Sequence, residues 1–159
     1  MMDGSIALGD EGERTFDAFF AERFDELSRL AFLLTGASAV ADEIAQDACE
    51  EVFRRWEHID HHRAYARSAV INGARAWGRR RTRQRINMQQ AGSVPAFDAD
   101  TIAVRNVLGD LPQAEREVLV LRFYADLKVD DIARELGIPP GTVKSHIHRG
   151  LTRMHKELS

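Results

Sequence analysis

A stripe of acidic and amide side chains recurs at helical spacing in the first third of the sequence. Its members fall at i, i+3, i+4 and i+7, and they are Glu43, Gln46, Asp47 and Glu50, with Asp42 alongside. Like charges four residues apart repel, so Glu43 and Asp47 do not stabilise their own helix. A basic partner would explain the stripe, and a solvated acidic face is the alternative.

A run of arginines follows the acidic stripe. Residues 63–85 contain eight arginines and no Asp or Glu. Such a run is typical of a surface that binds polyanions. Asn72 lies inside it, where its amide could both donate and accept hydrogen bonds, or could instead be buried against a neighbouring backbone.

A second basic window, residues 138–156, overlaps a helix-turn-helix spacing. Ala133 is small enough to let two helices approach, Gly137 four residues later suits the positive φ of a tight turn, and Val143 is the apolar wedge residue. Ile132, Leu136, Ile138 and Ile147 are expected to fill the same wedge. The residues that point away from it on the second helix are Thr142, Lys144, Ser145, His146, His148 and Arg149. Such a helix could enter a DNA major groove, although a plain helical hairpin with a solvated face fits the same pattern.

Catalytic and metal chemistry find no support in the sequence. His58, His61 and His62 form one cluster and His146 and His148 another, but neither has a carboxylate or cysteine at ligand spacing. The chain has no phosphate-cradling glycine loop and no nucleophile elbow. We therefore expect no catalytic residue, no metal and no cofactor.

Helices at regular intervals are expected to position these groups. Apolar periodicity predicts helices over residues 14–35, 39–57, 63–83, 101–109 and 112–124, followed by the helix-turn-helix. Ser38 is expected to cap the second of these helices, and Pro112 is expected to open the fifth. The fold class is therefore all-α: two small helical domains joined by a flexible linker, the second a helix-turn-helix. The boundaries give a tail over 1–13, a first domain over 14–83, a linker rich in Gln, Gly, Ser and Pro over 84–100, and a second domain over 101–159.

Composition limits the class of protein further. The 159 residues carry a net charge of −3, yet residues 1–51 hold −10 and residues 52–159 hold +7. The single cysteine, Cys49, suits a reducing compartment, and no apolar run is long enough to span a bilayer. We expect a cytoplasmic protein that does not bind membranes.

Taken together, these motifs resemble the sigma-70 family of RNA polymerase initiation factors over roughly residues 14–159. The resemblance is to the extracytoplasmic-function (ECF) type, and within it to the sigma-E-like subgroup. ADEIAQDA at 41–48 looks like the acidic core-binding motif, and YARSAVINGARAWGRRR at 65–81 looks like the helix that melts and reads the minus-ten element. Residues 111–150 are similar to the domain that binds the minus-thirty-five element.

The resemblance implies a role for each group of residues. Core polymerase, through the clamp helices of its largest subunit, would bind Asp42, Glu43, Gln46 and Asp47. Minus-ten DNA would contact Arg67, Asn72, Arg75, Arg79 and Arg80, and residues 58–63 match the family's specificity loop in position. Minus-thirty-five DNA would contact the six outward residues from Thr142 to Arg149. The expected partners are core RNA polymerase, promoter DNA and an anti-sigma protein.

Two departures from the family and two rival functions accompany this interpretation. Asp42 precedes Glu43, whereas the family more often places Glu before Asp, and Lys128 stands where Ser or Thr is commoner, so the first helix of the helix-turn-helix lacks its usual cap. Separately, Gly73 within a helix predicts close backbone approach or a local kink. One rival is a stand-alone helix-turn-helix regulator that dimerises through residues 1–90. The other is a helical anti-activator or interaction protein whose arginines only solubilise it.

Overall fold

The protein consists of two compact helical units. The computed structural model describes residues 15–84 and 97–158, and the boundary between the units falls between residues 94 and 95. Within the described residues the secondary structure is helical, with no strand. The predicted class, all-α with two small domains, is confirmed.

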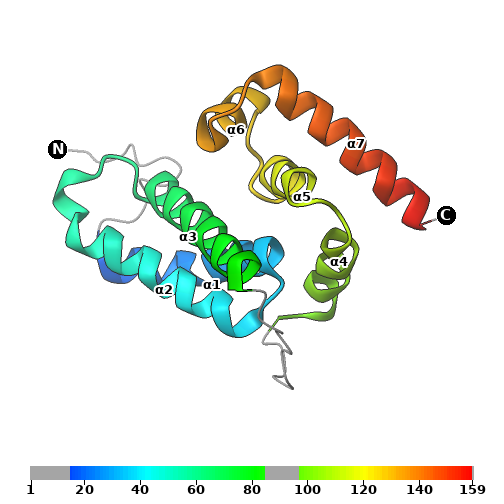
Figure 1. Cartoon of the computed structure of the whole chain (residues 1–159). Coiled ribbons are helices and arrows are strands. Elements are labelled where there is room, and N and C mark those ends of the chain that lie inside the picture. Colours follow the sequence, from blue (N-terminus) through cyan, green and yellow to red (C-terminus); the bar gives the residue numbers. More distant parts are fainter. Residues whose placement is uncertain (1–14, 85–96, 159) are drawn as a thin grey trace. The chain divides into compact units, whose positions relative to one another are not determined.

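The first unit is a three-helix bundle (Figure 1). Its helices are α1 (Phe16–Thr35), α2 (Ser38–Arg54) and α3 (His62–Gln84), and each packs against the other two. A short 3-10 helix, η3 (Trp56–His58), leads from α2 to α3. The largest side chains that are fully buried in this bundle are Phe19, Leu27, Val52, Val70 and Ile71.

Local signals set the two ends of α1. The Thr15 hydroxyl accepts a hydrogen bond from the N–H of Ala18 at 3.1 Å, which satisfies one free donor of the first turn. At the other end Gly36 adopts φ 78°, and its N–H donates to the carbonyl of Phe32 at 2.7 Å. A glycine tolerates this left-handed conformation, so the predicted end of the helix near residue 35 is confirmed.

The prediction that Ser38 caps α2 is wrong. Ala37 takes the extended N-cap position with no side-chain cap, and Ser38 is the first helical residue. The hydroxyl of Thr35 accepts from the N–H of Ala37 at 3.2 Å, so the chain turns one residue earlier than predicted. At its far end α2 stops at Arg54 rather than residue 57, because the backbone tightens into η3.

Gly73 lies where α3 packs closely against α2. A Cβ atom at this position would lie 3.1 Å from Cγ2 of Ile44, which is tighter than ordinary van der Waals contact. The close approach predicted from this glycine is confirmed.

In its described residues the second unit comprises α4, α5, α6 and α7, which Figure 1 labels, and a short π-helical segment. Helix α4 (Ala99–Gly109) precedes α5 (Gln113–Leu119), which continues as the π-helical η4 (Val120–Tyr124). Pro112 is the N-cap of α5 rather than its first residue. Helices α6 (Val129–Leu136) and α7 (Pro140–Leu158) complete the unit. Helix α3 ends at Gln84 and α4 begins at Ala99, so both extend slightly into the predicted linker. Residues 85–96 of the linker lie outside the described residues, as does the predicted tail.

The geometry of α6 and α7 confirms the helix-turn-helix. Gly137 has φ 71°, and its N–H donates to the carbonyl of Ala133 at 2.8 Å. Ile132, Leu136 and Val143 are buried between the helices, whereas Ile138 and Ile147 are only half-buried. The turn therefore depends on a glycine conformation and on three well-packed apolar side chains.

Lys128 offers a test of how the second unit is stabilised. It holds the extended N-cap conformation of α6, with φ −77° and ψ 158°, but makes no side-chain cap hydrogen bond. Because a serine there could accept from the first turn, we expect Lys128→Ser to raise the free energy of unfolding by about 1 kcal/mol relative to Lys128→Ala. Thermal unfolding of both variants, followed by circular dichroism, measures this difference; equal midpoints would contradict it.

Candidate functional site

The acidic stripe lies on the exposed face of α2. Glu43, Gln46 and Asp47 are exposed and form no ion pair or side-chain hydrogen bond with the described residues. Asp42 differs, because its Oδ1 accepts a hydrogen bond from the buried Ser28 hydroxyl of α1 at 2.5 Å. The stripe therefore combines one anchored carboxylate with neighbours that are available to a partner.

An exposed aromatic patch continues the acidic stripe, and the sequence interpretation missed it. Phe53 follows Glu50 by three residues on α2, and it is 61% exposed. Its ring lies 5.0 Å from that of Phe16, which in turn lies 6.0 Å from Phe20, itself 39% exposed. We call Phe16, Phe20 and Phe53 the aromatic patch. The spacing of Phe53 from Glu43 and Glu50 was the signal that could have revealed it.

Helix α3 presents Asn72 and two arginines to solvent. Asn72, Arg79 and Arg80 are exposed, and Arg67 and Arg75 are half-buried. The exposure of Asn72 contradicts the alternative of a buried amide. Since Asn72, Arg75 and Arg79 fall at i, i+3 and i+7, they share one face of α3.

The first arginine of the run has a structural role. The Nε of Arg63 lies 2.9 Å from Oε2 of Glu26, and the pair ties α3 to α1. The arginine run is therefore not uniformly a solvated face.

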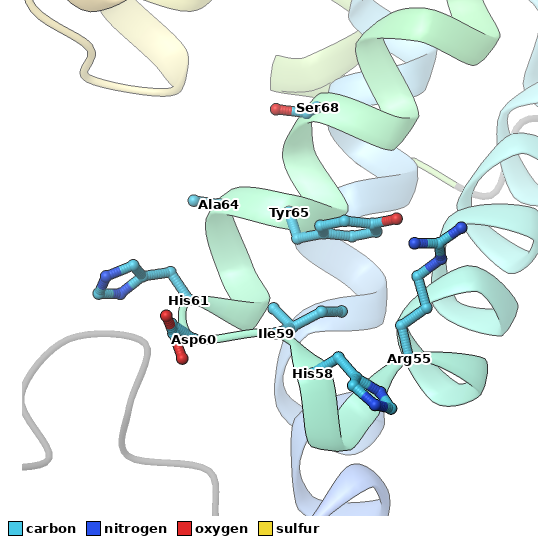
Figure 2. Close-up of a pocket in the computed structure, with 8 residues that line it drawn as sticks. All are labelled: Arg55, His58, Ile59, Asp60, His61, Ala64, Tyr65 and Ser68. Atoms are coloured by element: carbon cyan, nitrogen blue, oxygen red, sulfur yellow. The ribbon is translucent and has the colours of Figure 1, made fainter.

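An open pocket of about 360 Å³ lies at the start of α3 (Figure 2). The loop before α3 and the first turns of α3 line it, with Ser68 one turn before Asn72. Its lining residues are Arg55, His58, Ile59, Asp60, His61, Ala64, Tyr65 and Ser68. The pocket thus combines hydrogen-bond donors, acceptors and an aromatic ring, and it includes most of the predicted specificity loop.

Glu51 holds one wall of the pocket in place. Its Oε2 accepts from the Tyr65 hydroxyl at 3.2 Å and pairs with Nε of Arg55 at 2.8 Å. The hydrogen bond from Arg54 is the main cause that lowers the pKa of the Glu51 carboxyl, with Tyr65 and the charges of Arg54 and Arg55 adding to it. Glu51 is therefore a charged anchor for the two side chains.

The aromatic residues near the pocket pack against other side chains. Trp56 stacks on His62 with ring centroids 3.6 Å apart and an interplanar angle of 10°, and it meets Phe19 edge-on at 5.8 Å. Trp77 is half-buried, with the guanidinium of Arg81 5.3 Å from its ring centre. Trp56 therefore packs against rings within the bundle, whereas Trp77 contacts Arg81 of its own helix.

Helix α7 carries the six predicted outward residues. Lys144, Ser145, His148 and Arg149 are exposed, and Thr142 and His146 are half-buried. The structure therefore places all six at least partly at the surface of the second helix of the helix-turn-helix.

A buried carboxylate of α5 lies beneath this helix. Glu115 is 4% exposed; its Oε1 lies 2.8 Å from Nε of Arg153, and its Oε2 lies 3.6 Å from Nε of Arg149. Nothing in the sequence links Glu115 to these arginines, because the partners are more than thirty residues apart.

The described residues contain neither a candidate metal site nor a candidate membrane-spanning helix. Among the described residues, no group of three or more His, Cys, Asp and Glu side chains could hold a metal ion. No helix in the described ranges has the length and apolarity that a bilayer crossing requires.

Known proteins resemble this chain in sequence. Residues 101–154 match the family model described as Sigma-70, region 4. The RNA polymerase sigma-E factor of Streptomyces coelicolor is 33% identical over 151 residues, which cover 90% of this chain and 85% of the relative. The ECF RNA polymerase sigma factor RpoE of Cereibacter sphaeroides is 26% identical, with 90% and 88% covered.

Solved structures share the fold. The sigma factor RpoE of Bartonella quintana, in complex with the anti-sigma factor NepR, matches with a TM-score of 0.75 at 20% identity, over 90% of this chain and 96% of that one. CnrH in complex with the cytosolic domain of CnrY matches with a TM-score of 0.66 at 21% identity, over 90% and 86%.

Proposed function

The chain belongs to the ECF sigma factors, which direct transcription initiation by RNA polymerase, and we propose that it does so by reading both promoter elements and aiding strand opening. Sigma factors bind core polymerase and promoter DNA and are not enzymes. In this proposal the chain acts in the cytoplasm, and each of its two units contacts a different part of the promoter.

The acidic stripe supports binding to core polymerase. Glu43, Gln46 and Asp47 are exposed on α2 and repel one another, so a basic partner would relieve their repulsion. Arginines of the clamp helices in the largest polymerase subunit would donate charge-assisted hydrogen bonds to these carboxylates. This exposed stripe is the observation that carries the proposal, because a stand-alone DNA-binding regulator does not account for it.

The helix-turn-helix supports recognition of the minus-thirty-five element. Helix α7 presents Lys144, Ser145, His148 and Arg149 on its exposed side, opposite the buried Val143. A helix of this kind fits the major groove, where side chains reach base edges and phosphates.

Helix α3 and the pocket support binding of the opened minus-ten strand. Asn72, Arg75 and Arg79 share one face, and Ser68 extends that face into the pocket. A base that leaves the duplex needs a cavity with hydrogen-bonding groups and a ring surface, and the backbone beside it needs cations. The pocket and the arginines of α3 provide both.

Reconstitution tests the whole proposal. Core polymerase mixed with this chain should initiate from a subset of a randomised promoter library, and each alone should not. A chain that binds a palindromic DNA site without polymerase would favour the stand-alone regulator. A chain that shows no salt-dependent DNA binding would favour the anti-activator. The solved complex of the Bartonella quintana sigma factor with the anti-sigma factor NepR supports adding an anti-sigma protein to the proposed partners.

The aromatic patch gives a separate prediction for polymerase binding. Because Phe53 is 61% exposed and continues the acidic stripe, Phe53→Ser should weaken core binding by about tenfold or more while changing stability little. Titration of labelled chain with core polymerase measures the affinity, and Phe123→Ser, an equally exposed phenylalanine of the second unit, is the control. Equal affinities for Phe53→Ser and the wild type would exclude the patch from the interface.

A further inference from the structure

Arg149 and His146 connect the buried carboxylate of Glu115 on α5 to the surface of α7. Glu115 lies 3.6 Å from Nε of Arg149, and a terminal nitrogen of Arg149 lies 2.9 Å from Nδ1 of His146. Arg153 pairs with the other oxygen of Glu115 at 2.8 Å and helps to neutralise that carboxylate. Arg149 therefore bridges a fixed negative charge and a histidine ring.

This contact determines which histidine nitrogen can donate. An arginine guanidinium has five N–H donors and no acceptor, so a hydrogen bond to Nδ1 requires that Nδ1 accept. A neutral imidazole whose Nδ1 accepts carries its proton on Nε2. No described residue accepts a hydrogen bond from Nε2 of His146, so that donor is available to a ligand.

We propose that His146 reads a guanine in the minus-thirty-five element through its Nε2–H, and that Arg149 and Glu115 are positioning residues that hold His146 in this tautomer. The proposal rests on the proposed function, because it needs α7 to enter the major groove. It adds a specificity-determining residue and the class of base that it recognises.

The chemistry of the major groove favours guanine for a single, fixed donor. Guanine presents two adjacent acceptors, N7 and O6, whereas cytosine presents an amino donor that would face the Nε2–H unfavourably. Adenine places its amino donor beside N7, and thymine places a methyl group beside O4. A donor that meets two neighbouring acceptors also tolerates small shifts of the helix.

Selection with the complete holoenzyme tests this inference. Core polymerase with the full-length chain would be presented with promoters randomised over the upstream element, and bound DNA would be sequenced. The variants are His146→Ala, His146→Arg, Arg149→Met and Glu115→Gln. His155→Ala is the matched control, because it removes an exposed histidine of α7 outside the predicted DNA-binding set.

The expected pattern is specific to one base pair. The wild type should prefer guanine there by about tenfold, and 7-deazaguanine, which lacks the N7 acceptor, should weaken binding. His146→Ala should lose this preference alone, and His146→Arg should keep it because arginine is also a donor. Arg149→Met and Glu115→Gln should both reduce it. Because Glu115 is buried and outside the predicted DNA-binding set, Glu115→Gln tests the relay without removing a DNA contact, and His146→Ala tests the recognition of guanine even if Glu115→Gln does not fold. The control should match the wild type.

Two results would overturn the inference in different ways. An unchanged guanine preference in His146→Ala, with normal promoter selection, would reject the role of His146 and leave the proposed function intact. A wild-type holoenzyme that selects no upstream sequence would reject the proposed function itself, and the inference with it.

Discussion

Replacing Asp47 with arginine is expected to abolish binding to core polymerase and leave the fold intact. Asp47 lies at the centre of the exposed acidic stripe, four residues after Glu43, and forms no ion pair with the described residues. An arginine there would face the basic partner with a like charge, and truncating or reversing one side of an interfacial charge pair commonly costs several kcal/mol. Affinity should therefore fall by about a hundredfold or more.

A fluorescence titration of labelled chain with core polymerase measures this loss. Asp25→Arg makes the same charge reversal at an exposed position of α1 outside the stripe, and it should retain most of the affinity. The thermal midpoints of both variants should stay close to that of the wild type, because both side chains are exposed. If Asp47→Arg binds core polymerase as tightly as the wild type, the acidic stripe is not the interface.

The features that could be predicted from the sequence are those set by residues close together in the chain. Gly36 and Gly137 ended helices as expected, because a positive φ is a local requirement that glycine meets. The helix-turn-helix was predictable for the same reason, since Ala133, Gly137 and Val143 lie within eleven residues. The exposed face of α2 was predictable because the helical period places Glu43 and Asp47 on one face and Ile44 and Val52 on the other.

The features that escaped prediction depend on contacts between distant segments. Glu115 is buried because α7 brings two arginines over α5, and Gly150 allows this approach: a Cβ there would lie 2.8 Å from Cδ1 of Leu119. The pocket beside α3 exists because η3 and the following loop turn back toward Tyr65 and Ser68. The error at Ser38 is different, because it is local: Ala37 takes the N-cap position, and its N–H donates to the Thr35 hydroxyl two residues earlier.

The second large effect is expected at the step of strand opening. Asn72→Ala and Arg75→Ala should leave core binding and upstream duplex binding unchanged but reduce promoter opening by about tenfold or more. The reason is that an unpaired base and the backbone beside it are held only after the duplex opens, and Asn72 and Arg75 share the face of α3 that leads from the pocket. The loss would therefore appear in the open complex alone.

Permanganate footprinting of unpaired thymines in the holoenzyme–promoter complex measures opening directly. Arg81→Ala is the matched control, because it removes an arginine from the same helix nine residues from Asn72, on the opposite face, where Arg81 covers Trp77. That variant should keep most of the wild-type thymine reactivity. The control therefore distinguishes the effect of removing any positive charge from α3 from the effect of removing a side chain on the face that carries Asn72. Wild-type thymine reactivity in both Asn72→Ala and Arg75→Ala would mean that α3 supplies charge but neither opens nor holds the strand.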